Sequence, residues 1–207
     1  MIYGDSTTFS YTINCKYSWP YKYNFKFRLK SFSNGYKIFA IFDYLPNDKS
    51  DNYFLTEEQL YVKSIVYNYK IGFKLEEIVK LFVSSIRNEF NDESYKGKYL
   101  VLIPPINDEF LVYRASNFLE LLSSYLEMKN GYELVKRSNV EYDYNQKKIS
   151  REDFYSFFIF NDSLLNKELY IIDAVLSTGI ASKYFFEKLQ NMGVKKATFI
   201  YLAKSRF

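Results

Sequence analysis

The sequence contains no histidine, and Cys15 is its only cysteine among 207 residues. Without histidine, the chain cannot build a Ser-His-Asp triad, a Cys–His nucleophile or a catalytic His dyad. A single cysteine provides neither a disulfide framework nor a Cys/His zinc site within one chain. The composition therefore excludes these classes of enzyme and of small stapled domain.

Long apolar runs are also missing. No stretch approaches the ~20 apolar residues that a membrane-spanning helix needs. The first residues, Met1-Ile2-Tyr3-Gly4-Asp5, lack the basic and apolar regions of a signal peptide. We expect a cytoplasmic protein without a membrane segment.

A strong charge of one sign is absent as well, since 28 basic residues face 24 acidic ones, for a formal net charge of +4. This mild excess favours the approach of anionic ligands but falls short of the footprint of a dedicated nucleic-acid-binding domain. The 22 Tyr and 20 Phe residues would suit base stacking. Such usage also follows from an AT-rich coding sequence, which we favour, so nucleic-acid binding is kept as a third alternative only.

Short apolar runs alternate with helical patterns along the chain. A capping box beginning at Thr56 predicts a helix to about Tyr69, which Gly72 ends. Apolar spacing predicts further helices over 75–86, 118–126 and 180–192, and strands over 36–44, 99–103, 169–173 and 197–202. This alternation predicts an α/β fold with a mostly parallel sheet flanked by helices. We expect residues 1–34 to form a small N-terminal β-rich elaboration on a main domain over 35–207.

The segment 169–182 combines an apolar strand, a hydroxyl-rich turn and a helix. We expect the strand to end at Asp173, whose carboxylate would bind hydroxyl groups. Ser177, Thr178 and Gly179 would then leave backbone N–H groups at a helix N-terminus, where phosphate is favoured. Together these groups suit a sugar phosphate; the alternative is that Asp173 caps the helix after a plain turn.

Residues 173–181 resemble the phosphoribosyl-pyrophosphate (PRPP) loop of type I phosphoribosyltransferases, in which two acidic residues precede Val-x-Thr-Thr-Gly-x-Thr. Two positions differ, because Ala174 stands where the family has its second acid and Ala181 stands where it has its last Thr. Ser182 offers a hydroxyl one position later. The resemblance implies the type I phosphoribosyltransferase fold over the main domain.

Within that family, the order of segments from about residue 36 to 204 resembles the ComF-like, competence-associated branch. The matching segments are Ser64–Gly72, Val101–Pro105, Arg114–Asn117, Lys136-Arg137, Gln146 and Ile149–Arg151. The four-cysteine zinc module common in that branch is absent. The chain is similar to a divergent member.

The resemblance implies roles for several residues. The loop acid Asp173 would hold ribose hydroxyls and Mg²⁺, and Ser177, Thr178, Gly179 and Ser182 would hold the 5′-phosphate. Arg114, Lys136 and Arg137 would neutralise pyrophosphate, next to a loop at Pro104-Pro105. Plain alternatives stay open: the three cations as surface charges, and the two prolines as a strand terminator.

Two functions remain in view. The first is a phosphoribosyltransferase-like protein that binds PRPP or a related nucleotide with Mg²⁺ and transfers phosphoribosyl. The second is a degraded scaffold that senses a nucleotide or binds a protein or DNA in uptake, repair or defence. The family resemblance also implies a homodimer as an assembly.

Overall fold

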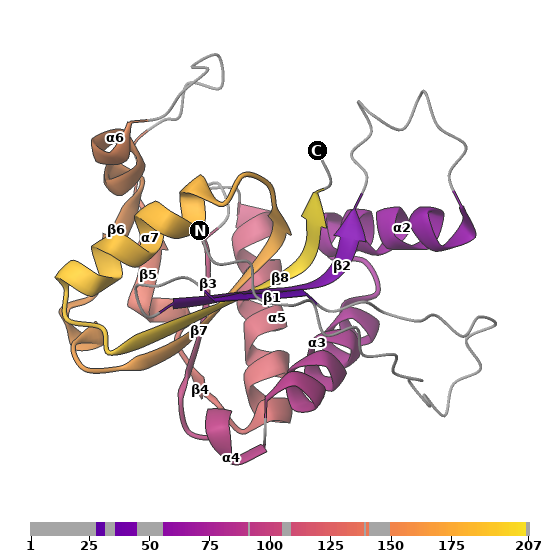
Figure 1. The fold of residues 1–207 in the computed structure, drawn as a ribbon, viewed down its shortest axis with the longest axis horizontal. Coiled ribbons are helices and arrows are strands. Elements are labelled where there is room, and N and C mark those ends of the chain that lie inside the picture. Colours follow the sequence, from indigo (N-terminus) through magenta and orange to yellow (C-terminus); the bar gives the residue numbers. More distant parts are fainter. Residues whose placement is uncertain are drawn as a thin grey trace.

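A six-stranded sheet forms the centre of the computed structural model, which describes residues 28–31, 36–44, 56–90, 92–104, 109–138, 140 and 150–205. The strand order is β1-β2-β8-β7-β3-β4 (Figure 1). The strands are β1 (Arg28–Ser31), β2 (Tyr36–Tyr44), β3 (Tyr99–Leu102), β4 (Lys129–Asn130), β7 (Glu168–Leu176) and β8 (Lys196–Ser205). All neighbours pair in parallel except β1 with β2. The predicted fold class, an α/β protein with a mostly parallel sheet, is confirmed.

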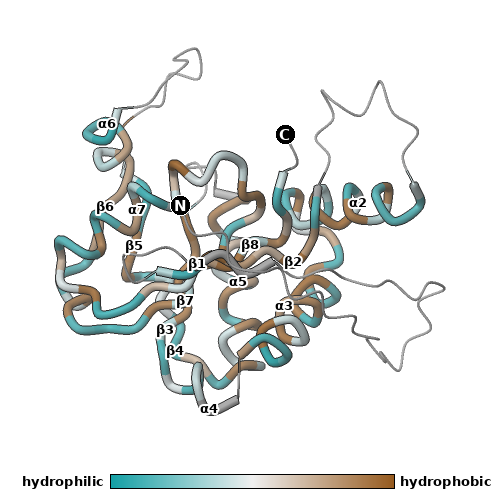
Figure 2. The backbone as a smooth tube through the Cα atoms, viewed as in Figure 1, coloured by the Kyte–Doolittle hydropathy of each residue, from teal (hydrophilic) through white to brown (hydrophobic). Residues whose placement is uncertain are grey.

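Helices cover both faces of this sheet, so its central strands are buried on two sides. One core lies under α2 (Glu57–Ile71), α3 (Leu75–Glu89), α4 (Asp92–Tyr95) and α5 (Glu109–Leu126). The other lies under α6 (Arg151–Ser156), α7 (Ile180–Asn191) and a two-stranded sheet of β5 (Val135–Arg137) and β6 (Phe158–Phe160). Of the two short 3-10 turns, η2 (Asp162–Leu164) packs Leu164 into this second core. The other, η1 (Tyr132–Leu134), contacts the first core through Tyr132 and the second through Leu134. Figure 2 shows the apolar strands between these layers.

The helix signals in the sequence correspond to real caps. Thr56 accepts a hydrogen bond from the Gln59 N–H, and the Gln59 side chain accepts one from the Thr56 N–H, which is the predicted capping box. Gly72 ends α2 in the left-handed conformation, at φ 69°. No helix in the described ranges is long and apolar enough to cross a membrane.

Two expected element bounds need correction, and most of a third segment lies outside the described residues. The strand that was expected to end at Asp173 continues to Leu176, because β8 pairs with it along its whole length. Helix α5 begins at Glu109, so Arg114 lies inside it and not ahead of it. Of the expected N-terminal elaboration, the described residues include only β1, which pairs with β2 at the edge of the main sheet. Residues 1–27 lie outside the described residues.

Candidate functional site

The candidate site lies where the parallel strands β3, β7 and β8 reach their carboxyl ends. In α/β folds this is the edge where ligands bind. Asp173 is opposite Tyr201 of β8, and Ile172 is opposite Leu102 of β3. The Ile103 N–H donates to the Ile172 carbonyl at 3.0 Å, so the chain leaves β3 next to Ile172. Pro104 therefore follows the end of β3 at the same edge of the sheet as Asp173, and its predicted role stays a prediction, while Pro105 lies outside the described residues.

Asp173 is a half-buried carboxylate with few groups to compensate its charge. The Ala174 N–H donates to its Oδ1 at 2.7 Å. Burial raises the pKa of Asp173 to about 6, although the Ala174 hydrogen bond and the charge of Lys70 both act to lower it. Burial therefore outweighs the local stabilisation of the charge.

The proposed alternative role of Asp173 as a helix cap does not match the geometry. The residue at the N-cap of α7 is Gly179, and the first-turn N–H of Ile180 donates to the Thr178 hydroxyl at 3.4 Å. Asp173 lies within the strand, and its Oδ1 accepts a hydrogen bond from the N–H of its neighbour Ala174. This carboxylate does not cap α7.

Two residues from α2 and α5, on the face of the sheet opposite to α7, lie near Asp173. Burial, and then the charge of Asp173, raise the pKa of Tyr69 in α2, while Arg114 acts in the opposite direction. Arg114 of α5 is half-buried, and its Nη2 donates to the Lys70 carbonyl at the end of α2. The structure therefore gathers Asp173, Tyr69 and Arg114 at one place. The ligand roles predicted for Asp173 and Arg114 stay predictions.

Tyr69 was not predicted as a site residue. Its ring packs edge-on against Phe118, with centroids 5.1 Å apart, and so fixes the junction between α2 and α5. In the sequence it is one more aromatic residue on an apolar helix face, just before Gly72. The sequence feature that could have pointed to Tyr69 is its position three residues before the glycine that ends the helix. That position does not distinguish a core residue from a site residue.

Ser182 is placed differently from the prediction. Its side chain is fully buried, and its Oγ lies 2.6 Å from the Tyr201 hydroxyl oxygen. The helical periodicity of α7 turns this side chain toward the sheet, so its hydroxyl does not face the loop. Ser182 instead joins the first turn of α7 to β8, next to Asp173.

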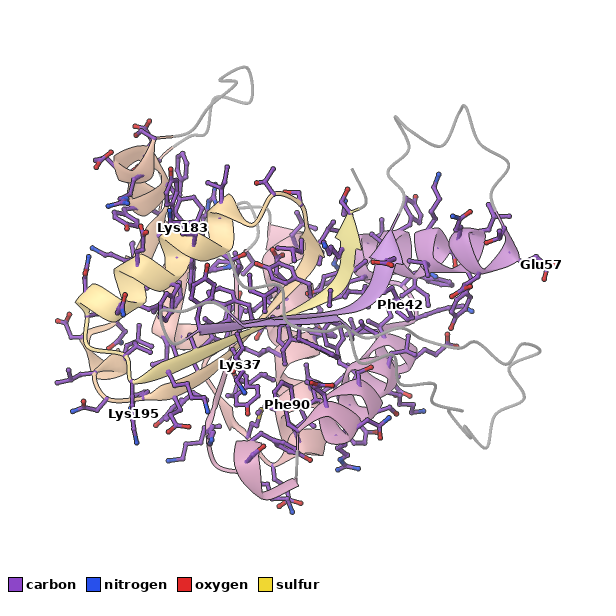
Figure 3. The ribbon with its side chains drawn as sticks, in the orientation of Figure 1. Lys37, Phe42, Glu57, Phe90, Lys183 and Lys195 are labelled. Carbon is purple, nitrogen blue, oxygen red and sulfur yellow. The ribbon has the colours of Figure 1, made fainter. Side chains whose placement is uncertain are left out.

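The turn between β7 and α7 has the features of a phosphate-binding loop. Ser177 and Thr178 are exposed, and Gly179 takes φ 81°, a conformation that favours glycine. A Cβ built on Gly179 would meet only Leu176, at 3.9 Å, so the backbone there is open to approach. The first-turn N–H groups of an α-helix have no intrahelical acceptor and can bind an anion. In Figure 3, Lys183 marks the first turns of α7 beyond this loop.

Lys136 and Arg137 belong to the second sheet. Lys136 Nζ lies 2.5 Å from Glu133 Oε2 in an exposed ion pair. The Arg137 guanidinium lies 5.0 Å from the Phe157 ring centroid and 5.2 Å from that of Phe158. Both cations thus have local structural contacts, and their role with pyrophosphate stays a prediction.

Among the described residues, no group of three or more His, Cys, Asp and Glu is placed to hold a metal ion. Mg²⁺ in substrate sites commonly uses one or two carboxylates together with phosphate oxygens of the ligand and water. A single carboxylate, Asp173, near the open turn between β7 and α7 is compatible with Mg²⁺ that is held mainly by a phosphate ligand and water.

No family model matches the chain, and no curated protein matches it. In structure it is similar to a hypoxanthine phosphoribosyltransferase from Staphylococcus aureus, at 19% identity over 64% of this chain and 66% of that one, with a TM-score of 0.37. It is also similar to HGPRT-ase from Leishmania tarentolae in complex with GMP (8% identity, 69% and 67% covered, TM-score 0.36). A third is a purine phosphoribosyltransferase from Pyrococcus horikoshii (11% identity, 63% and 82% covered, TM-score 0.36).

This chain spans about two thirds of the length of the first two of these proteins. Their identities lie below 20% and their TM-scores below 0.5. The residues of the site, and not these neighbours, therefore carry the functional interpretation.

Proposed function

We propose that this protein binds PRPP or a related ribose 5-phosphate nucleotide at the carboxyl end of β7. One observation supports this most directly: β7 presents a half-buried carboxylate at Asp173 and, four to six residues later, a Ser-Thr-Gly turn at a helix N-terminus in which Ser177 and Thr178 are exposed. The carboxylate suits ribose hydroxyls and the turn suits phosphate. A single ligand with both groups is a ribose phosphate.

Arg114 would contribute positive charge on the other side of the ribose. Its guanidinium is held by the Lys70 carbonyl, which orients it before any ligand arrives. Catalysis of phosphoribosyl transfer would break the bond between C1 and the pyrophosphate oxygen and form a bond from C1 to an acceptor nitrogen, which loses its proton. Preorganised cations lower the cost of the charge that develops on departing pyrophosphate.

Mg²⁺ would be held by Asp173 on the protein side and by the oxygens of the ligand. When bound, it supplies charge neutralisation for the pyrophosphate leaving group. Asp173 would also orient the ribose. The ComF-like assignment, a homodimeric assembly and a pathway in competence or defence are finer proposals that rest on the sequence resemblance.

A second candidate function is favoured by Ala174. The family places an acid there, and each missing charge-assisted hydrogen bond would cost about 1.5 to 3 kcal/mol, a ten- to hundredfold loss. A pocket weakened in this way would suit a nucleotide sensor or a protein-binding scaffold that no longer transfers phosphoribosyl.

Calorimetric titration of the wild type with PRPP and Mg²⁺, and then with nucleoside monophosphates, tests the shared premise. We expect saturable binding in the micromolar range and loss of that binding in Asp173→Ala. Asp162→Ala, which changes an exposed acid in η2, is the matched control and should bind like the wild type.

The possible results separate the functions. Binding accompanied by pyrophosphate release with an acceptor supports the transferase, and binding without release across acceptors supports the sensor. Absence of heat with every ligand, or unchanged binding by Asp173→Ala, would refute the proposed site.

A further inference from the structure

A cluster of lysines lies at the amino-terminal edge of the sheet, the edge opposite to Asp173. Two of them lie in strands β4 and β8, and the other four lie in the segments just before β3, β7 and β8. We refer to them as the lysine edge: Lys96, Lys98, Lys129, Lys167, Lys195 and Lys196. Figure 3 labels Lys195 at this end of the sheet, and Figure 2 shows the turns there as hydrophilic.

Direct contacts join most of these lysines into one surface. Lys98 Nζ and Lys195 Nζ lie 2.7 and 3.5 Å from the two carboxylate oxygens of Glu168. Lys196 is opposite Glu168 in the strand register. The single carboxylate of Glu168 is thus shared among three ammonium groups.

Tyr99 anchors the other part of the lysine edge. Lys167 Nζ lies 3.3 Å from the Tyr99 hydroxyl and 4.4 Å from its ring centroid. Lys129, opposite Tyr99 in β4, has its Nζ 5.2 Å from the same centroid. The hydrogen bond from Lys167 and the charge of Lys129 lower the pKa of Tyr99, as a positive local potential should.

Lysines outnumber the acidic residues that pair with them at the lysine edge. In the described part of the chain, the ion pairs of these six lysines involve two acidic residues, Glu168 and Glu127, the latter 3.4 Å from Lys96. These six lysines and two glutamates together carry a formal charge of +4.

The spacing of these charges suits a linear polyanion better than a small one. Neighbouring strands lie about 4.8 Å apart, so lysines at the starts of four strands spread over about 15 Å. A small anion would meet two of them, whereas a phosphate chain would meet most of them in succession. Lysine ammonium groups bind phosphate as point charges and need no base contacts.

We infer that the lysine edge binds the phosphate backbone of a nucleic acid without reading its sequence. This inference is independent of the proposed ribose phosphate site, because the two surfaces lie at opposite ends of the same parallel strands. Deoxyribose and ribose backbones share this chemistry, so the experiment compares them directly.

Fluorescence anisotropy with a labelled oligonucleotide, as single-stranded DNA, single-stranded RNA and duplex DNA, is the test. Titrations run at several salt concentrations between about 50 and 200 mM. The edge variant carries Lys129→Gln, Lys195→Gln and Lys196→Gln, three exposed lysines. The control variant carries Lys63→Gln, Lys74→Gln and Lys80→Gln, which lie on α2, at the N-cap of α3 and on α3. Both variants lose the same charge, so a difference between them reports position.

We expect the wild-type affinity to fall steeply with salt and the edge variant to bind at least about tenfold more weakly at the lowest salt. For duplex DNA its salt slope should be smaller by up to about 2.7, or about 0.9 for each phosphate contact removed. The control variant should stay within about twofold of the wild type. Equal binding to DNA and RNA, or a preference for either, is compatible with backbone recognition and identifies its source.

Several results would overturn the inference. The wild type could fail to bind any oligonucleotide, or both variants could lose affinity equally, which would indicate net charge alone. Binding to vesicles that contain anionic phospholipid, with none to oligonucleotides, would assign the surface to a membrane. Thermal melting and PRPP titration of both variants verify folding. The lysine edge is tested independently of the ribose phosphate site, so a wild type that does not bind PRPP would not change the interpretation of the oligonucleotide titrations.

Discussion

Replacement of Asp173 by asparagine should stabilise the ligand-free protein while it removes ligand binding. The carboxylate is half-buried, and burial is the main cause that raises its pKa to about 6 from the ordinary 3.8. Asparagine keeps an oxygen that can accept the Ala174 N–H. The variant therefore removes the buried charge without losing that hydrogen bond.

The size and sign of the effect follow from proton linkage. A pKa of about 6 in the folded state against 3.8 in the unfolded state corresponds to about 3 kcal/mol at most. Below the unfolded value the acid is protonated in both states and costs nothing. As the pH rises from about 4 to about 6, the unfolded state ionises while the buried group of the folded state stays protonated. The wild type therefore loses this stability across that range, and the loss is complete once the folded state has ionised as well.

Thermal melting monitored by circular dichroism, with and without PRPP and Mg²⁺, is the assay. At neutral pH, Asp173→Asn should melt higher than the wild type by up to about 6 to 12 °C, since 1 kcal/mol shifts Tm by about 2 to 4 °C at this chain length. The difference should shrink toward pH 4, and the ligand should no longer raise Tm. Asp162→Asn, at an exposed position, should change little. A lower Tm for Asp173→Asn at neutral pH, or a difference that does not vary with pH, would refute the reasoning.

Two other substitutions probe the supports of the site. Gly72→Ala should destabilise by about 1 to 3 kcal/mol, because φ is 69° there and an added Cβ would lie 2.7 Å from Arg114 Nε. It should also weaken PRPP binding by moving Arg114; lower stability with unchanged calorimetric affinity would separate Arg114 from the site. Tyr201→Phe should cost about 1 to 3 kcal/mol in urea unfolding, since the buried Ser182 hydroxyl loses its partner. Adding Ser182→Ala should recover part of that loss. If Tyr201→Phe alone were as stable as the wild type, the Ser182–Tyr201 hydrogen bond would not contribute to stability.

The main elements could be predicted because their patterns are strong. β2 was expected over 36–44 and spans Tyr36–Tyr44, and α3 shows its apolar face at the expected spacing. These segments are long and either uniformly apolar or regularly periodic, so burial decides their conformation. Thr56 and Gly72 then fix the ends of α2 by local hydrogen bonding and backbone conformation.

Short elements could not be predicted in the same way. β4, β5, β6 and α6 have two to six residues each, too few to display a period. The antiparallel pairing of β5 with β6 and their packing on α7 depend on contacts between distant segments. The sequence of this region holds no local signal for those contacts.

The surroundings of the side chains at the site also could not be predicted from the sequence. The motif placed Asp173 and Ser182 in one loop, but β8 pairing extends the strand past Asp173, and the helix turns Ser182 inward to Tyr201. Tyr69 lies at the site because α2 and α5 are joined there by the packing of Tyr69 on Phe118 and by the hydrogen bond from Arg114 to the Lys70 carbonyl. Such positions follow from register and helix packing, which a local motif does not specify.

The energetic cost of burying the Asp173 carboxylate is itself an argument that this residue binds a ligand. A structural carboxylate at a helix start would accept N–H bonds and gain stability from its charge. In α7 the first-turn N–H of Ile180 donates to the Thr178 hydroxyl instead, and burial raises the pKa of Asp173. An asparagine would supply the same acceptor for Ala174 without ionising. Charges that destabilise a fold are typical of functional sites, where a ligand compensates them. The neighbouring exposed Ser-Thr-Gly turn indicates which ligand would do so: one that brings hydroxyls to the carboxylate and phosphate to the turn.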